Sequence, residues 1–301
     1  MVSRWTVPVQ VGEVCCSLSC RDTEVFSMWQ ELYGEFLCDR PADINIDIEV
    51  TDRMNSACID AAVPKMRVAQ EGSRFWASNG LFAADYDSSG PRLSLTLERG
   101  LLNPQMDFKL MNRVMSMAYN TVCASRHGTR FPALLVHGCG IARHGRGLLF
   151  VGPCEAGKTT IARLCGGQYG QVLNDEMVLV SRPDGNGGGL AVRGIPIIGG
   201  FPQSRNLAVP LSCVLLLKKS KRTAVRPVSR MEAYQRFLLQ VISPAHFGVY
   251  DRQALLSLIA EFSDEVTATT PFYELEFTLE REPLWEAVGR LEESLETREE
   301  T

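Results

Sequence analysis

The sequence predicts an α/β protein in which a smaller α+β module precedes a larger α/β core. Short β-like runs around one helical stretch indicate the first module. From Leu134 onward the pattern changes to nearly continuous apolar strands, separated by helical segments. A glycine-rich segment, 152–159, joins one of these strands to a helix. We expect the first module over residues 1–130, the core over 131–282 and an amphipathic C-terminal helix over 283–301.

The composition limits the class of protein. The chain has 301 residues, of which 45% are hydrophobic, so it is long enough for two domains that each bury a core. A formal net charge of −4 disfavours a general nucleic-acid binder. No run approaches the roughly 18 apolar residues of a membrane span, and the chain starts without a secretion signal. We therefore expect no membrane partner, a cytoplasmic location and 10 cysteines present as reduced thiols.

Alternating and apolar runs predict the elements of the first module. Asn45 to Val50 alternates polar and apolar residues, which is typical of a half-buried strand. The turn residues 87–91 separate two β-like runs and indicate a hairpin. A long helix with apolar residues at spacings of three and four follows. The expected strands are Thr6–Val11, Ile44–Val50, Arg74–Tyr86 and Arg92–Glu98, and the expected helices are Glu24–Phe36 and Pro104–Arg126.

The core is predicted to alternate buried strands with helices. A glycine-rich turn is expected after His137, and a second one over residues 183–189. Ser229 and Glu232 form a capping box that predicts the start of a helix. The expected strands are Leu134–His137, Gly147–Val151, Gln171–Ser181, Leu211–Leu217 and Phe272–Leu279, and the other expected helices are Lys158–Cys165 and Asp251–Phe262.

The segment 152–159 matches the phosphate-loop pattern G-x-x-x-x-G-K-[ST] in full, between an apolar strand and a helix. In such a loop backbone amides and the helix N-terminus face the phosphates, Lys158 contacts the β- and γ-phosphates, and Thr159 offers its hydroxyl to Mg²⁺. We therefore expect ATP and Mg²⁺ as cofactors. Glu155 is unusual, because a carboxylate facing a triphosphate is repelled unless it turns outward. The candidate nucleotide-binding residues are Gly152, Glu155, Ala156, Gly157, Lys158, Thr159 and Thr160.

An acidic pair, Asp175 and Glu176, follows Lys158 after a short helix. No guanine-reading N-K-x-D and no L-S-G-G-Q transporter signature occurs in the sequence. Together with His137-Gly138, the phosphate loop and Arg193–Pro196, this order resembles the bacterial HPr kinase/phosphorylase family and the shorter HPr-kinase-related proteins. The latter include kinases of lasso-peptide clusters and a component of the SynChlorMet peptide-maturation cassette. The resemblance covers residues 131–282.

The resemblance implies a P-loop kinase core of the HPr kinase and PEP carboxykinase-like type. It implies that Asp175 is the base near the accepting hydroxyl and that Glu176 lies near the metal. A carboxylate there orients the hydroxyl and takes its proton, while Lys158 and Mg²⁺ offset phosphate charge. His137 matches a family histidine that precedes the phosphate-loop strand. A histidine after three apolar residues is equally consistent with a core residue, so both interpretations stay open. Arg193 and Arg205 are candidates for phosphate or substrate contacts, or are solvated arginines.

The sequence leaves three hypotheses for function. The first is a phosphotransferase that moves the γ-phosphate of ATP to a Ser or Thr hydroxyl of a peptide or small protein. The second is an ATP-binding switch or maturation accessory without kinase activity, and the third is a small-molecule kinase. Homo-oligomer formation is left open. A basic cluster either docks an acidic peptide or is a solvated turn: Lys218, Lys219, Lys221, Arg222, Arg226 and Arg230.

Overall fold

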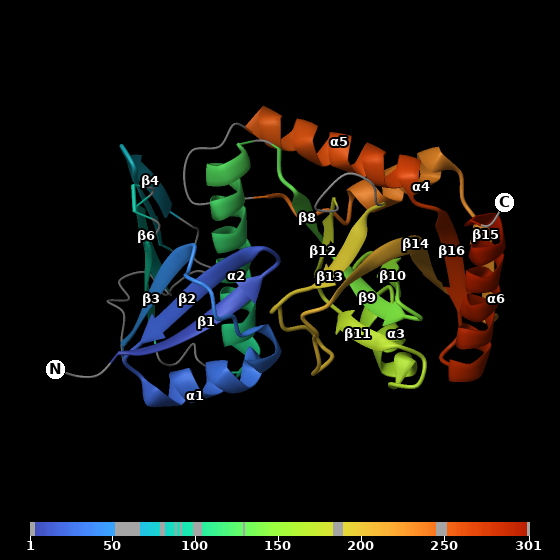
Figure 1. Cartoon of the computed structure of the whole chain (residues 1–301), viewed down its shortest axis with the longest axis horizontal. Helices are drawn as coiled ribbons and strands as arrows, with labels where there is room; N and C mark the ends of the chain where they lie inside the picture. The colour runs from blue at the N-terminus through green and yellow to red at the C-terminus, as the bar shows by residue number, and fades with distance from the viewer. Residues whose placement is uncertain are drawn as a thin grey trace. The chain divides into compact units, whose positions relative to one another are not determined.

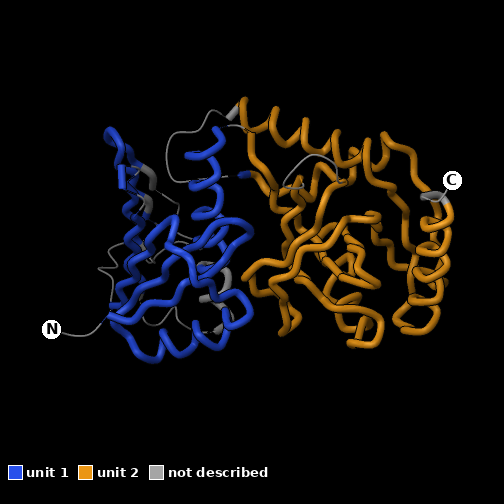
Figure 2. Tube along the Cα trace, viewed as in Figure 1, with its two compact units in different colours: residues 1–128, 244–252 blue, residues 129–243, 253–301 orange. Residues whose placement is uncertain are grey.

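The computed structural model divides the chain into two compact units (Figure 2). Unit 1 contains residues 1–128 and 244–252, and unit 2 contains residues 129–243 and 253–301. Each unit is built on its own mixed sheet, so the predicted α/β class is confirmed. The glycine turn predicted at 183–189 lies outside the described residues except for Gly189. The structure describes residues 4–51, 67–78, 82–87, 89–90, 92–98, 104–128, 130–182, 189–244 and 252–299.

Unit 1 has a seven-stranded sheet whose strands run in the order β1-β2-β3-β7-β6-β5-β4. Neighbouring strands are antiparallel except for the parallel pairs β2–β3 and β3–β7. Figure 1 labels β1, β2, β3, β4 and β6 of this sheet. The bounds are β1 Trp5–Val11, β2 Val14–Cys20, β3 Ile44–Thr51, β4 Arg67–Glu71, β5 Arg74–Ser78, β6 Phe82–Asp87 and β7 Arg92–Glu98.

The sheet of unit 1 differs from the sequence predictions at β2 and β4, neither of which was predicted, and at β5 and β6. The single strand expected over 74–86 is wrong, because β5 and β6 pair with each other antiparallel, with Phe75 opposite Tyr86. β2 was not predicted, and its buried residues include Cys15, Cys16 and Cys20. Cys16 and Cys20 are free and serve there as small apolar strand residues.

The helices of unit 1 begin where the sequence places capping or helix-forming residues. The carboxylate of Asp22 accepts hydrogen bonds from the amides of Glu24 and Val25, at 3.0 and 3.2 Å, and so caps the first helix. Val25 and Trp29 turn inward from that helix and are buried. The bounds are α1 Thr23–Leu32, a 3₁₀ turn at Gly34–Phe36, and α2 Pro104–His127.

Unit 2 has a second sheet, in which the strands run in the order β11-β9-β10-β14-β13-β12-β8. β16 extends it by pairing in parallel with β14, and β15 pairs with β16. The pair β10–β14 is also parallel, so three neighbouring strands point the same way. The bounds are β8 Ala133–Val136, β9 Gly138–Arg143, β10 Arg146–Val151, β11 Gln171–Asn174, β12 Val178–Ser181, β13 Ala191–Gly194, β14 Ala208–Lys219, β15 Ala224–Pro227 and β16 Phe272–Phe277.

The helices of unit 2 are α3 Lys158–Cys165, α4 Arg230–Leu238, α5 Arg252–Thr269 and α6 Arg281–Glu299. α3 and α6 contribute to one core with β9, β10, β14 and β16, in which Phe150 and Trp285 meet edge to face. The capping box is confirmed in part, because the Ser229 hydroxyl accepts a hydrogen bond from the Glu232 amide at 3.2 Å. None of the helices in the described ranges combines the length and the apolar character needed to cross a bilayer.

The glycine-rich turn expected after His137 is wrong, because residues 138–143 form the strand β9. β9 pairs antiparallel with β10, and the two-residue turn between them lies at His144 and Gly145. Both turn residues have positive φ, 50° and 75°, which is the backbone of a tight hairpin. Gly138 and Gly140 lie inside this strand, at positions where a Cβ would collide with Leu149 and Val178 respectively.

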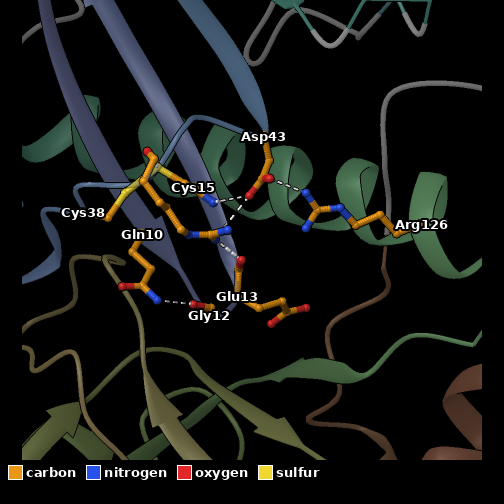
Figure 3. The surroundings of a disulfide bond; sticks show 8 residues. Gln10, Gly12, Glu13, Cys15, Cys38, Asp43 and Arg126 are labelled. Carbon is orange, nitrogen blue, oxygen red and sulfur yellow. Dashed lines mark hydrogen bonds and ion pairs between the residues drawn. A yellow bond between two sulfur atoms is a disulfide. The ribbon is translucent and has the colours of Figure 1, made fainter. Parts of the chain in front are cut away.

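The expectation that all cysteines are reduced is wrong for one pair, because Cys15 and Cys38 form a disulfide in unit 1 (Figure 3). The Cys15 amide donates to the Asp43 carboxylate at 2.7 Å. Asp43 also pairs with Arg40 and with Arg126 of α2. Asp43 therefore holds the segment after the 3₁₀ turn against both β2 and α2, and the disulfide closes the same loop.

Replacing both Cys15 and Cys38 with serine should lower the free energy of unfolding of unit 1. The disulfide closes a loop with a sequence separation of 23, for which chain entropy predicts about 3 kcal/mol. Urea unfolding followed by fluorescence measures the loss, and dithiothreitol should reproduce it in the wild type. Cys154→Ser is the control, because Cys154 is free and exposed. Equal stability of the double variant and the wild type would contradict the prediction.

Candidate functional site

The phosphate loop lies at the carboxyl end of β10, beside the parallel strands β14 and β16. Residues 152–157 connect β10 directly to α3, so the strand, loop and helix predicted from the sequence are present. Gly157 caps α3 at φ 110°, a backbone conformation that favours glycine. A Cβ on Gly157 would also lie 2.7 Å from Phe277 Cζ. Both constraints require glycine at this position.

Lys158 is buried and points back along its own loop. Its Nζ donates hydrogen bonds to the carbonyl oxygens of Gly152 and Pro153, at 2.9 and 3.0 Å. Burial lowers the pKa of Lys158, while the neighbouring carboxylates, Glu176 first among them, act to raise it. A buried cation held by neutral carbonyls is incompletely compensated, which suits it to meet an anion.

Glu155 is exposed and has a left-handed backbone, with φ 64°. Its exposure agrees with the expected outward turn of the carboxylate. In a residue with a Cβ this conformation costs about 1 to 2 kcal/mol, so the loop keeps a strained residue at its tip. Cys154 beside it is also exposed.

Thr159 and Asp175 meet directly. The Thr159 hydroxyl donates to Asp175 Oδ2 at 2.7 Å, and Asp175 is only 1% exposed. The backbone of Gly199 and Gly200 covers this pair, because a Cβ on Gly199 would overlap the Asp175 carboxylate and one on Gly200 would lie 3.1 Å from Thr159 Cγ2. The Gly-Gly sequence was the signal for this close approach, which our sequence analysis missed.

The acidic pair lies in a turn and not inside a strand. The single strand predicted over 171–181 is wrong, because β11 ends at Asn174 and β12 begins at Val178. The buried Asn174 side chain causes the break: its Oδ1 accepts from the amides of Glu176 and Met177, at 2.8 and 2.9 Å. Its Nδ2 donates to the carbonyls of Ile195 and Ile197. Sequence reasoning assigned Asn174 no role, although asparagine commonly stabilises turns in this way.

His137 lies between β8 and β9, near the same turn. Its Nε2 is 3.8 Å from Glu176 Oε1, which is too long for a direct hydrogen bond. The main chains are joined, because the Gly138 amide donates to the Glu176 carbonyl at 3.3 Å. Burial, and next the positive charge of Lys158, lower the pKa of His137. The neutral imidazole is therefore favoured near pH 7.

The two candidate arginines lie on neighbouring segments. Arg193 is half-buried on β13, opposite Leu179 of β12. Arg205 is exposed, and its backbone amide donates to the carbonyl of Leu173 at 3.0 Å. Gly194 allows this close approach, because a Cβ there would overlap the Arg205 carbonyl. The roles of both side chains toward phosphate stay predictions.

The basic cluster predicted near residues 218–230 is largely neutralised by acids from other elements. Glu274 on β16 is 4% exposed and contacts Arg236 of α4 at 2.7 Å and Arg226 at 2.9 Å. Lys218 pairs with Glu276 at 2.7 Å, and Arg222 pairs with the same carboxylate at 3.4 Å. These ion pairs join β14, β15, β16 and α4, so most of the cluster has a structural role. Sequence spacing missed Glu274 and Glu276 because they lie far along the chain.

Comparison with known proteins finds one family. A family model described as SynChlorMet cassette protein ScmC matches residues 101–291, which is more than half of the chain. The matched range contains the phosphate loop, the acidic pair and His137. No curated protein matches the sequence.

Replacing Glu155 with glycine should raise the free energy of unfolding by about 1 kcal/mol, because glycine adopts a left-handed backbone without a Cβ penalty. Glu155→Ala is the matched control, since alanine removes the carboxylate but keeps the Cβ. Urea unfolding of both variants and the wild type measures the difference. If the two variants are equally stable, the conformation of residue 155 carries no measurable strain.

Proposed function

The chain belongs to the family of the SynChlorMet cassette protein ScmC, and we propose that it is an ATP-dependent phosphotransferase with an HPr kinase-like P-loop core. Its proposed acceptor is a Ser or Thr hydroxyl of a peptide or small protein. The observation that carries the proposal is the hydrogen bond from Thr159 of the phosphate loop to Asp175, with Lys158, Glu176 and His137 around it.

The residues present fit a nucleotide with a magnesium ion. Mg²⁺ prefers hard oxygen ligands, and the Thr159 hydroxyl and the Asp175 carboxylate already lie together at 2.7 Å. The loop amides before α3 and the Lys158 ammonium would hold the phosphates. When bound, ATP would supply the phosphoryl group and Mg²⁺ would supply positive charge that offsets the charge of the phosphates. Lys158 would exchange its bonds to the Gly152 and Pro153 carbonyls for phosphate oxygens.

The contacts favour a division of roles between the two acids. Because Asp175 is buried and accepts the Thr159 hydroxyl, it is suited to the metal side of the site. Glu176 is 42% exposed in its side chain and lies 3.8 Å from His137, so it is better placed to reach an incoming hydroxyl. This assignment reverses the roles that the family resemblance implies for Asp175 and Glu176.

The proposed transfer moves the γ-phosphoryl group of ATP directly to the acceptor hydroxyl. The acceptor oxygen forms a bond to the γ-phosphorus while the bond from that phosphorus to the bridging oxygen breaks. ADP leaves with the electron pair of the broken bond. The Glu176 carboxylate takes the hydroxyl proton, and the neutral imidazole of His137 can accept that proton in turn.

A second candidate is an ATP-binding switch or accessory protein that does not phosphorylate its partner. The presence of Glu155 in the phosphate loop favours it, because even an outward-turned carboxylate leaves a negative charge close to a bound triphosphate and lowers its affinity. Such a protein still requires Lys158 to bind the phosphates of ATP, but it needs no carboxylate to take a proton from an acceptor hydroxyl.

The test is transfer of label from γ-labelled ATP to a protein or peptide band in a lysate of the source cell. Lys158→Ala should abolish both nucleotide binding and transfer. Glu176→Gln should lower transfer by about 100-fold or more at unchanged Mg²⁺ requirement, as for loss of a general base. Asp175→Asn should instead raise the Mg²⁺ concentration needed for half-maximal transfer.

Lys219→Ala is the matched control for Lys158→Ala, because Lys219 is an exposed lysine on β14. It should transfer label at the wild-type rate. The kinase would be rejected, and the switch favoured, if the wild type and Glu176→Gln both bind ATP but transfer no label, while Lys158→Ala does not bind ATP. Label found only on a small molecule would assign the acceptor to that class instead.

A further inference from the structure

In unit 1, strand β3 continues past the end of its neighbour β2. The parallel pairing of β2 with β3 stops at Ser19 opposite Asp47, whereas the pairing of β3 with β7 continues to Thr51. After Cys20 the chain leaves the sheet at Arg21 and enters α1. Among the described residues, no strand pairs with residues 48–51 on the side that β2 vacates. Such a stretch presents backbone donors and acceptors to a partner strand.

A cavity of about 250 Å³ opens at this place. It lies between the end of β2, the start of α1 and the last residues of β3. The cavity is therefore next to the edge of β3 that β2 no longer covers. Its lining combines apolar side chains of β3 with charged groups from three segments. The lining residues are Arg4, Arg21, Asp22, Ile48, Glu49 and Val50.

Some charged side chains of the cavity already bind other groups of the protein, and others do not. Asp22 caps α1 through two backbone amides. Arg4 pairs with Asp47 at 3.2 Å. Arg21 and Glu49 are exposed, and no ion pair engages either side chain within the described part of the chain. The guanidinium of Arg21 is therefore available for a carboxylate on a ligand.

We propose that this cavity binds an extended acidic peptide segment, which adds to β3 as a strand beyond the end of β2. The peptide backbone pairs with residues 48–51, its apolar side chains lie beside Ile48 and Val50, and a carboxylate reaches Arg21. Strand addition of this kind draws affinity from main-chain hydrogen bonds and specificity from alternate side chains. Glu49 lies on the other face of β3 and repels an acid next to it, so its charge lowers the affinity for an acidic peptide.

Other ligand classes fit the recess less well. A compact small molecule leaves the backbone groups of 48–51 without partners. A phosphate-rich nucleic acid meets the carboxylate of Glu49 and finds only Arg21 uncommitted. The inference does not depend on kinase activity in unit 2, because the residues that carry it all belong to unit 1.

The test is fluorescence anisotropy of the full-length chain with a labelled hexapeptide of alternating valine and aspartate. We expect a dissociation constant below about 1 mM. Arg21→Glu should weaken binding by about ten-fold, as for loss of a charge-assisted hydrogen bond. Glu49→Lys should strengthen it, which a merely unfolded variant cannot do. Arg113→Glu on α2 is the matched charge control and should bind as the wild type does, since Arg113 is exposed outside the cavity.

Two altered peptides separate strand pairing from simple charge attraction. A peptide with lysine in place of aspartate, and one methylated on alternate backbone nitrogens, should both bind at least about ten-fold more weakly. Equal binding of either one overturns the proposal. So does unchanged binding by Arg21→Glu. Binding only of a peptide copied from residues 52–66 would assign the edge to the chain's own following segment and would equally overturn it.

Discussion

Inside unit 2, the amide side chain of Asn174 joins two segments that the candidate site needs at fixed positions. Its oxygen holds the backbone of the turn at Glu176 and Met177, and its nitrogen holds the carbonyls of Ile195 and Ile197. The side chain is 1% exposed, so each of these bonds replaces a bond to water that burial has removed. Because of this bridge, Asp175 faces Thr159 and the following loop folds back over both.

The charges around the phosphate loop constrain one another. Lys158 is buried among carbonyls, and the charges of Glu176 and Asp175 act to raise its pKa. Its own positive charge lowers the pKa of His137. An incoming phosphate would add negative charge next to two carboxylates, and Lys158 and a metal ion would offset it. This balance explains why the proposed function requires the metal and why Lys158 is the residue on which both candidate functions depend.

Ion pairs and a disulfide, in addition to apolar packing, hold neighbouring segments together in both units. Glu274 and Glu276 hold β14, β15, β16 and α4 together through arginine and lysine partners, and a buried carboxylate such as Glu274 is tolerated only because three cations surround it. In unit 1, Asp43 and the Cys15–Cys38 bond hold one loop against β2 and α2. A cluster that looks basic in the sequence is thus mostly paired with acids of the same unit.

The sequence by itself determined the features that depend on neighbouring residues. The phosphate loop between β10 and α3, the cap at Ser229 and the strand β3 were predictable, because turn chemistry, capping and alternation act over a few positions. The paired cysteines, the split of β5 from β6, the break at Asn174 and the acids beneath the basic cluster were not. The β5–β6 hairpin and the turn at Asn174 are short-range features that the residue pattern did not reveal. The cysteine pairing, the acids beneath the basic cluster and the second half of the Asn174 bridge result from contacts between segments far apart in the chain, such as Arg226 with Glu274 or Asn174 with Ile195. Only the tertiary structure brings such partners together, because their energy exists only once the intervening chain has folded.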